Sequence, residues 1–305
     1  MNILPLMMKL RVEQTDERCT ELIREFIQEN FNDMDALDTS QVLRTYCQSS
    51  RRLLANAPDD EELRQDHLFA LTRAIEWAIK AEQPWFATPL LEEAVTLVCE
   101  TPHDSDYPVR EAAWTSLDEL AGYYEQTGRR QATIDTLKRS LEYMAQVPKV
   151  VNYSLSFLCA PERKGAAITD LKPSPSTIIL RIIDLCNQMG RMDVADISRL
   201  QRQYWPEFSE ELSGKNYDAF YDMVNQMHDW SWTRSYHLKH DPVEDTEEYL
   251  NILDELERHL YYRLKDEPHG MGFCFRYWQT KREMLREYHI KWRSPAEMNP
   301  DVHFD

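Results

Sequence analysis

Residues 113–144 read 113-AWTSLDELAGYYEQTGRRQATIDTLKRSLEYM-144. Apolar residues recur at helical spacing on both sides of Gly128, which predicts two helices joined by a short turn. Ala121 and Ser140 are small enough to let two antiparallel helices approach closely, and glycine permits the backbone of a tight turn. The segment therefore predicts a helix hairpin.

Several positions of this hairpin follow a regular order of Leu, small, Tyr, Gly, large apolar and small residues: Leu120, Ala121, Tyr124, Gly128, Leu137 and Ser140. This order resembles the tetratricopeptide repeat, although Thr133 stands where that family has a small residue. Weaker matches are Ala74, Ile75, Ala78, Ala87, Leu91 and Ala94, with Glu82, Gln83 and Pro84 in place of the turn glycine, and Ile182, Ile183, Cys186, Gly190 and Ala195. The resemblance implies a divergent array of helix pairs over about residues 60–205 that serves as a partner-binding scaffold.

The spacing of the three units departs from the family. Counted from Glu82 to Gly128 to Gly190, they are 46 and 62 residues apart, whereas the repeat has about 34 residues. Helical periodicity nevertheless covers most of the chain, and the short connections make sequential helices antiparallel neighbours. The fold class is therefore expected to be all-α, an irregular array of antiparallel helix hairpins that resembles a tetratricopeptide-type α-solenoid. The expected helices are 15–31, 38–55, 58–80, 84–99, 108–126, 130–146, 175–189, 193–203, 206–228, 245–265 and 273–288.

One segment breaks this periodicity. From Val151 to Cys159 apolar and polar residues alternate, which is typical of a strand, and Leu10 with Val12 is the other short candidate for a strand pair. An extended loop packed on helices fits the same pattern, and so does a strand edge that accepts a partner peptide. The segment suggests the best boundary: an N-terminal array over 1–147, a linker or single strand over 148–173, and a C-terminal array over 174–305.

Composition narrows the classes of function. The 305 residues include only 7 glycines, which argues against Gly-rich nucleotide loops and most parallel α/β enzymes. The 6 cysteines are scattered without a C-x-x-C pair, which is typical of reduced thiols in a cytoplasmic protein. The N-terminal residues make a poor signal peptide, and no apolar run is long enough to cross a membrane.

The charge is strongly acidic and unevenly distributed. Lys and Arg number 35 against 53 Asp and Glu, so the net charge is −18. An acidic surface of this kind repels nucleic acid and attracts a basic protein partner, although acidity can also serve solubility alone. Between Arg276 and Arg293, however, there are six basic and two acidic residues. The net charge of this segment is therefore +4, and that of the rest of the chain is −22. Either this positive element docks on the negative body or the two form separate contact faces.

The search for catalytic chemistry gives two candidate sites. The chain lacks G-x-S-x-G, P-loop, H-E-x-x-H and Rossmann motifs, which lowers the expectation of an enzyme and implies no cofactor. Imidazole and carboxylate groups that could ligate zinc gather in one connection: His228, His237, His240 and Asp241. Their spacing matches no established metal motif, so an aromatic-rich loop is the plainer interpretation. A second enzyme site could lie at His269 and Cys274.

The C-terminal region has the most distinctive sequence. Gly270 and Gly272 precede an aromatic and basic helix, and Ser294 with Pro295 and Glu297 predicts a capped helical turn. Three interpretations remain open: a helix that caps the array, an RNA-binding or anion-binding face, and a partner-docking surface. The leading hypothesis for the whole chain is a non-catalytic, cytoplasmic interaction scaffold, for example an immunity or antitoxin-like protein that occludes a basic effector. The candidate contact residues are Trp230, Trp232, Tyr236, Arg276 and Trp278.

Overall fold

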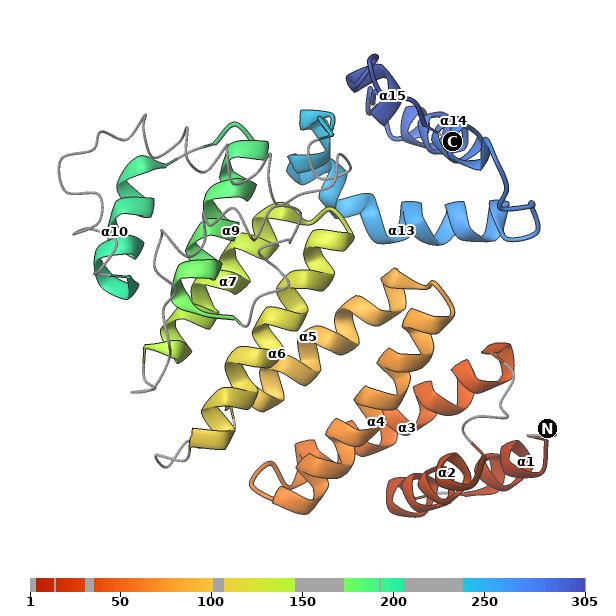
Figure 1. Ribbon diagram of the computed structural model, residues 1–305. Helices are drawn as coiled ribbons and strands as arrows, with labels where there is room; N and C mark the ends of the chain where they lie inside the picture. The colour runs from red at the N-terminus through yellow and green to blue at the C-terminus, as the bar shows by residue number, and fades with distance from the viewer. Residues whose placement is uncertain are drawn as a thin grey trace. The chain divides into compact units, whose positions relative to one another are not determined.

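The computed structural model describes residues 4–13, 15–30, 36–100, 107–145, 173–191, 193–205 and 238–304. Within these ranges the chain forms twelve α-helices, one short 3-10 helix and no strand (Figure 1). The expectation of an all-α protein is therefore confirmed for the described part of the chain. The chain divides into two compact units, residues 1–101 and 102–305.

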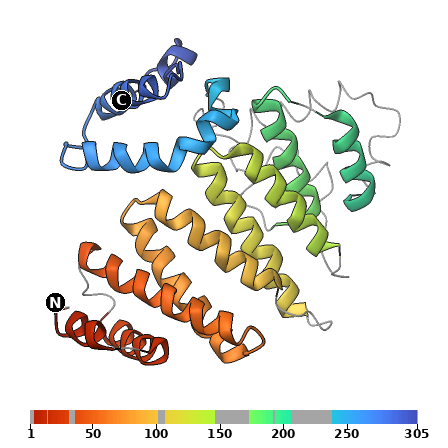
Figure 2. The ribbon, with the colours of Figure 1, turned by 180° about the vertical axis from the view of Figure 1, so that it is seen from behind.

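The N-terminal unit consists of helices that each contact the next one along the chain. Figure 2 shows α3 to α5 from behind as neighbouring helices joined by short connections. Asp60 begins one of them as an N-cap, because its side chain accepts hydrogen bonds from the amides of Glu62 and Leu63. The helices are α1 (Leu4–Val12), α2 (Asp16–Asn30), α3 (Ala36–Asn56), α4 (Glu61–Lys80) and α5 (Pro84–Glu100).

The C-terminal unit contains the helix pair quoted above and two further groups of helices. α6 (Tyr107–Gln126) packs on α7 (Arg130–Met144), which contacts α9 (Pro175–Gln188), and α9 contacts α10 (Val194–Tyr204). The last group begins with the 3-10 helix η5 (Pro242–Asp245) and α13 (Glu247–Leu264), which contacts both η5 and α14 (Phe273–Glu287). The short α15 (Pro295–Met298) starts with the expected capping box of Ser294 and Glu297.

Three connections between paired helices share one backbone geometry, which also occurs after α14 at His289. Glu82, Gly128 and Gly190 all have positive φ, at 53°, 77° and 61°. In each case the next amide bonds to the carbonyl five residues before it: Gln83 to Ala78 at 2.9 Å, Arg129 to Tyr124 at 2.8 Å and Arg191 to Cys186 at 3.0 Å. This is the Schellman closure of a helix, for which glycine is preferred. Glu82 thus adopts a conformation that costs a non-glycine residue free energy.

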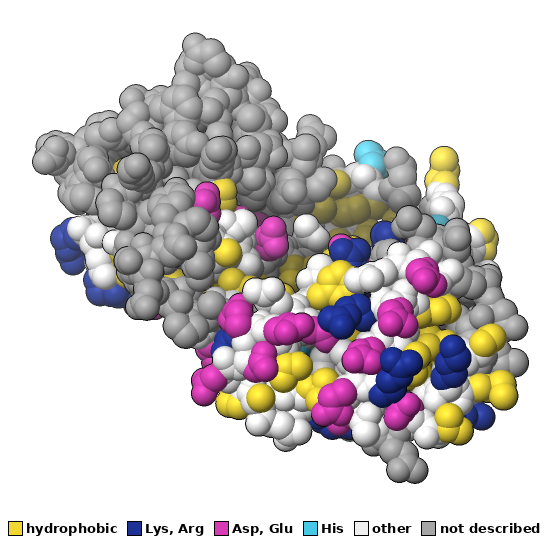
Figure 3. Space-filling model, turned by 90° about the horizontal axis from the view of Figure 1, so that it is seen from below, with side chains coloured by type: hydrophobic (Ala, Val, Ile, Leu, Met, Phe, Trp, Pro, Cys, Tyr) yellow, Lys and Arg dark blue, Asp and Glu magenta, His cyan; other side chains and the backbone are white. Residues whose placement is uncertain are grey.

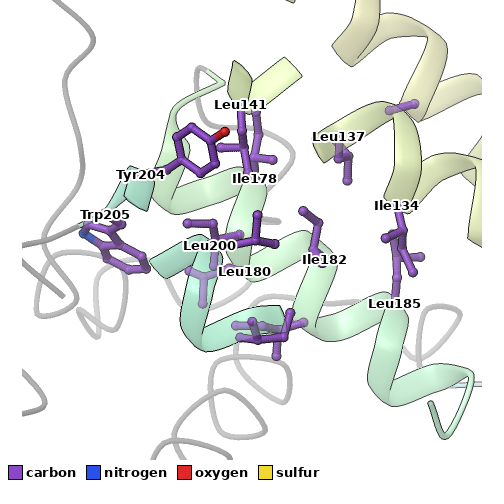
Figure 4. Packing of buried hydrophobic residues seen from close by; sticks show 14 of the residues in the cluster. Ile134, Leu137, Leu141, Ile178, Leu180, Ile182, Leu185, Leu200, Tyr204 and Trp205 are labelled. Atoms are coloured by element: carbon purple, nitrogen blue, oxygen red, sulfur yellow. The ribbon is translucent and has the colours of Figure 1, made fainter. Parts of the chain in front are cut away.

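The larger hydrophobic core of the C-terminal unit joins α6, α7, α9 and α10. Figure 4 shows Leu137 and Leu141 of α7, Ile178 and Ile182 of α9, and Leu200 of α10 gathered in this core. Ala121, Thr133 and Ser140, which occupy the small-residue positions of the hairpin, are fully buried. The Thr133 hydroxyl donates to the carbonyl of Arg129 at 3.0 Å, so its burial leaves no unpaired hydroxyl. Ala195, the matching position of the third unit, is exposed instead.

The structure corrects the expectation of a strand at Leu10 and Val12. Both residues lie in helix α1, whose Leu6 is buried while Val12 is 78% exposed. Alternation over so few residues is equally compatible with a helix, and packing on α2 decides between the two. The other strand candidate, Val151 to Cys159, and the expected helix at 206–228 lie outside the described residues, as does the linker 148–173 except for Pro173.

Candidate functional site

The candidate residues that the structure describes lie in one part of the chain, residues 238–304, here named the C-terminal module. These are His240, Asp241, His269, Cys274, Arg276 and Trp278. The other candidates, His228, Trp230, Trp232, Tyr236 and His237, lie outside the described residues. The module has a core of its own, formed by Tyr249, Leu253, Leu256, Leu260, Leu264, Met284, Leu285 and Trp292.

Asp241 serves as a helix cap and an anchor for the end of the chain. Its carboxylate accepts hydrogen bonds from the Val243 amide at 3.2 Å, from the Arg293 amide at 2.7 Å and from Arg293 Nε at 3.2 Å. Burial by itself raises the pKa of Asp241, but these bonds outweigh burial and lower it. The carboxylate is therefore held ionised by N–H donors.

His240 is hydrogen-bonded to a buried carboxylate. Its Nε2 lies 2.6 Å from Asp245 Oδ2, while Asp245 Oδ1 accepts from the guanidinium of Arg130 at 3.2 Å. Burial raises the pKa of Asp245, and the bonds from His240 and Arg130 outweigh that effect and lower it. No group of three or more His, Cys, Asp or Glu side chains arranged to hold a metal occurs in the described ranges. The zinc hypothesis, which also needs His228 and His237, remains a prediction.

Arg276 and Trp278 are two residues apart on α14, so their side chains leave different sides of the helix and have different surroundings. The Arg276 side chain is 56% exposed and donates to the Glu267 carboxylate, at 3.1 Å from its terminal nitrogen. Trp278 packs edge to face against Phe275, at 5.3 Å between centroids, and against Phe304, at 5.1 Å. Phe275 is 50% exposed, so this row of rings reaches the surface.

Three of the six basic residues between Arg276 and Arg293 form ion pairs within the module. Arg276 pairs with Glu267, Arg282 with Glu297, and Arg293 with Asp241. A nucleic-acid site needs cations that are free to contact phosphate. The observed pairing favours docking of these three arginines on acidic neighbours, whereas Arg286 and Lys291 are exposed.

A fourth basic residue, Lys281, is enclosed by aromatic rings. Its ammonium lies 5.0 Å from the ring centroid of Trp292 and 5.4 Å from that of Tyr249, within cation–π range. Desolvation by itself lowers the pKa of Lys281, but the nearby phenols and carboxylates outweigh it and raise the pKa, so the ammonium stays charged. The group, here named the Lys281 cluster, comprises Glu244, Tyr249, Glu257, Tyr277, Lys281 and Trp292.

Two aromatic side chains of the Lys281 cluster are hydrogen-bonded to its two glutamates. The Tyr277 hydroxyl donates to Glu257 at 3.1 Å, and Trp292 Nε1 donates to Glu244 at 2.6 Å. Burial, together with the charge of Glu257, raises the pKa of Tyr277, which keeps its hydroxyl protonated. The cluster joins η5, α13, α14 and the segment after α14, so its evident role is to hold the module together.

A second polar cluster, in the N-terminal unit, was not predicted from the sequence. Ser50 Oγ of α3 lies 2.8 Å from His67 Nδ1 of α4, and His67 Nε2 lies 3.0 Å from Glu93 Oε1 of α5. Arg51 Nε also donates to Glu93, at 2.6 Å. These four residues are named the His67 cluster. The available signal was the position of His67 on the apolar face of α4, in register with Ala70 and Leu71.

The His67 cluster has the residue types of a hydrolytic triad but not its accessibility. Ser50 and His67 are each only 1% exposed, and the Ser50 hydroxyl donates to the Tyr46 carbonyl at 2.8 Å. A nucleophile must be open to its substrate. Burial raises the pKa of Glu93, yet hydrogen bonds from His67 and Arg51 lower it overall to about 2. The cluster therefore ties α3, α4 and α5 together.

Comparisons with protein families, with characterised proteins and with solved structures give no significant match. In the described part of the chain, no helix is long and apolar enough to cross a membrane. The arguments for a function accordingly rest on the geometry and charge of this molecule.

Proposed function

We propose that the chain is a non-catalytic scaffold of the tetratricopeptide-like type whose acidic surface binds a basic protein partner. An immunity or antitoxin-like protein that occludes a basic effector is one form of this function. The proposal places the chain in the cytoplasm, and it requires neither a cofactor nor a membrane.

The arrangement of helices in pairs supports the scaffold. A turn closed by the same type of hydrogen bond joins the two helices of each pair. The turn lies at Glu82 between α4 and α5, at Gly128 between α6 and α7, and at Gly190 between α9 and α10. Helix pairs that repeat in this way pack on their neighbours and leave an extended surface for a partner. The buried small residues Ala121 and Ser140 agree with the resemblance at the α6–α7 hairpin.

The observation that carries the basic-partner proposal is the charge that the chain cannot neutralise. With 53 acidic and 35 basic side chains, one-to-one pairing leaves at least 53 − 35 = 18 carboxylates without a Lys or Arg partner. Such an excess speeds encounter with a positively charged protein and disfavours acidic ones. Figure 3 shows acidic and basic side chains interspersed on the described part of one face, so the excess is spread there rather than gathered in one block.

Helix α2 offers a place to test the proposal. Glu17, Glu21, Glu25 and Glu29 recur every four residues and are all exposed, which places them along one side of the helix. Arg18 pairs with Glu21 at 2.8 Å and offsets part of this charge. Like charges at this spacing cost a helix about 0.2–0.5 kcal/mol per pair. A bound basic surface would remove that cost.

The test compares two variants that change the net charge equally. The first variant, E17Q/E21Q/E25Q/E29Q, neutralises the four glutamates along one side of α2 and is named the ridge variant. In the control, D59N/E62Q/E82Q/E100Q, four exposed acids elsewhere in the same unit are neutralised. Each purified full-length chain is used to capture proteins from extracts of the native host at low salt, and the retained proteins are identified by mass spectrometry.

The proposal expects one stoichiometric basic protein that the wild type and the control retain and the ridge variant loses. The association rate of that protein, measured by stopped flow, should fall steeply as salt is raised. Equal retention by the ridge variant would remove α2 from the binding surface. An association rate insensitive to salt would contradict electrostatic capture as a whole.

A further inference from the structure

We propose that an electrostatic clasp holds the C-terminal module on the α6–α7 hairpin, and that the module leaves the hairpin as an intact unit when the charges of the clasp are reversed. The clasp consists of Arg129 and Arg130 on one side and Glu244, Asp245 and Asp254 on the other. This inference does not depend on the proposed function.

The two sides of the clasp belong to separate cores. The cluster around α6, α7, α9 and α10 draws its buried residues from Trp114 to Trp205, and that of the module draws them from Tyr249 to Trp292. Within the described ranges the two clusters share no side chain. Each core can therefore persist when the contact between them changes.

The clasp itself is made of ion pairs. Arg129 pairs with Asp254, and Arg130 lies 3.2 Å from Asp245 and 3.9 Å from Glu244. The Asp245 carboxylate is 4% exposed and Arg130 is 15% exposed, so their attraction is only weakly screened by solvent. The Asp254 side chain is 53% exposed, so the Arg129 pair is the more replaceable of the two.

The position of the arginines strengthens the contact. Arg129 is the N-cap of α7 and Arg130 is its first residue, and the first turn of α7 contains no acidic side chain. The partial positive charge of the helix N-terminus adds to the two guanidinium groups, and both attract the carboxylates of η5 and α13. Two arginines thus face three acids.

The module side of the clasp is fixed from within. Asp245 also binds His240, at 2.6 Å, and Glu244 accepts from Trp292 Nε1, also at 2.6 Å. These contacts lie inside the module and do not involve the hairpin. The carboxylates would therefore keep their places after the arginines are removed, which is why we expect the module to leave as a unit.

Hydrogen exchange of the full-length chain, read by mass spectrometry, tests the clasp. In R129E/R130E, amides of residues 126–131 and 242–254 should exchange at least about tenfold faster than in the wild type. Amides near Leu256, Leu260 and Leu285 should keep their protection, because the module core stays intact. The control R139E/R202E makes the same charge change at exposed positions of α7 and α10 and should leave both regions unchanged.

A charge exchange provides the decisive comparison. R129E and D254R should each speed exchange at the clasp, whereas R129E/D254R should return most of the protection because the pair is restored with reversed sign. The radius of gyration from small-angle scattering should rise in R129E/R130E and not in the control. Exchange at the clasp equal to that of the control would overturn the proposal. Loss of protection throughout the module would overturn its release as an intact unit.

Discussion

The His67 cluster and the Lys281 cluster both bring charge into a helical core, but they stabilise it differently. In the His67 cluster, Ser50 and Glu93 meet the two ring nitrogens of His67 through hydrogen bonds of 2.8 and 3.0 Å. In the Lys281 cluster, the cation faces the rings of Tyr249 and Trp292 at 5.0 to 5.4 Å. Hydrogen bonds with charged partners are short and directional, whereas cation–π attraction tolerates displacement. The His67 cluster therefore fixes the positions of its side chains, whereas the Lys281 cluster permits small shifts of the ammonium relative to the rings.

The largest effect is expected from removal of His67. H67L deletes both ring hydrogen bonds in a fully buried position, so the free energy of unfolding should fall by about 3–4 kcal/mol. Chemical denaturation followed by circular dichroism measures the loss. The matched control is H259L, since the His259 side chain is 45% exposed, and its effect should stay within about 0.5 kcal/mol. Equal effects of the two substitutions would show that the His67 cluster contributes nothing specific.

The next effect concerns pH. The pKa of Glu93 is lowered from 4.5 to about 2 in the folded chain. A lowered carboxyl pKa contributes stability that is fully present above about pH 4.5 and is lost as pH falls towards 2. The shift corresponds to about 3 kcal/mol. Denaturation curves between pH 6 and 2 should therefore fall less steeply for E93Q than for the wild type, and parallel curves would contradict the assignment.

The smallest of the three effects is expected in the Lys281 cluster. K281M keeps the apolar stem and removes the charge, so the loss is limited to cation–π attraction and pairing with Glu244 and Glu257, about 1–2 kcal/mol. K291M, at an exposed position, is the control and should leave the melting temperature unchanged. If K281M proved as damaging as H67L, the contrast between the two clusters would be wrong.

Local structure followed closely from sequence patterns. The expected helix starts at Arg130 and Phe273 and the capping box of Ser294 and Glu297 are confirmed. The turn at Gly128 has the positive φ that only glycine adopts easily. These features depend on neighbours within one or two turns of helix, so the order of residues is sufficient to predict them.

The polar clusters could not be predicted in the same way. His67 and Glu93 are 26 residues apart and Arg130 and Asp245 are 115 apart, on helices whose relative rotation no local pattern specifies. The sequence did show the positive charge of the C-terminal region. It left open whether that region docks on the acidic part of the same chain or forms a separate contact face. The observed pairs of Arg276, Arg282 and Arg293 favour docking within the module.

By itself, the sequence determined the helical class, the positions of the turns and the excess of acid, because periodicity, capping and composition are properties of the chain alone. The tertiary structure decided which charges meet. Asp241 became a cap, His240 a partner of Asp245, and Ser50 a buried hydroxyl rather than a nucleophile. Helix packing sets which side chains of neighbouring helices meet, and a hydrogen bond forms only where the two groups come within a narrow range of distance and angle.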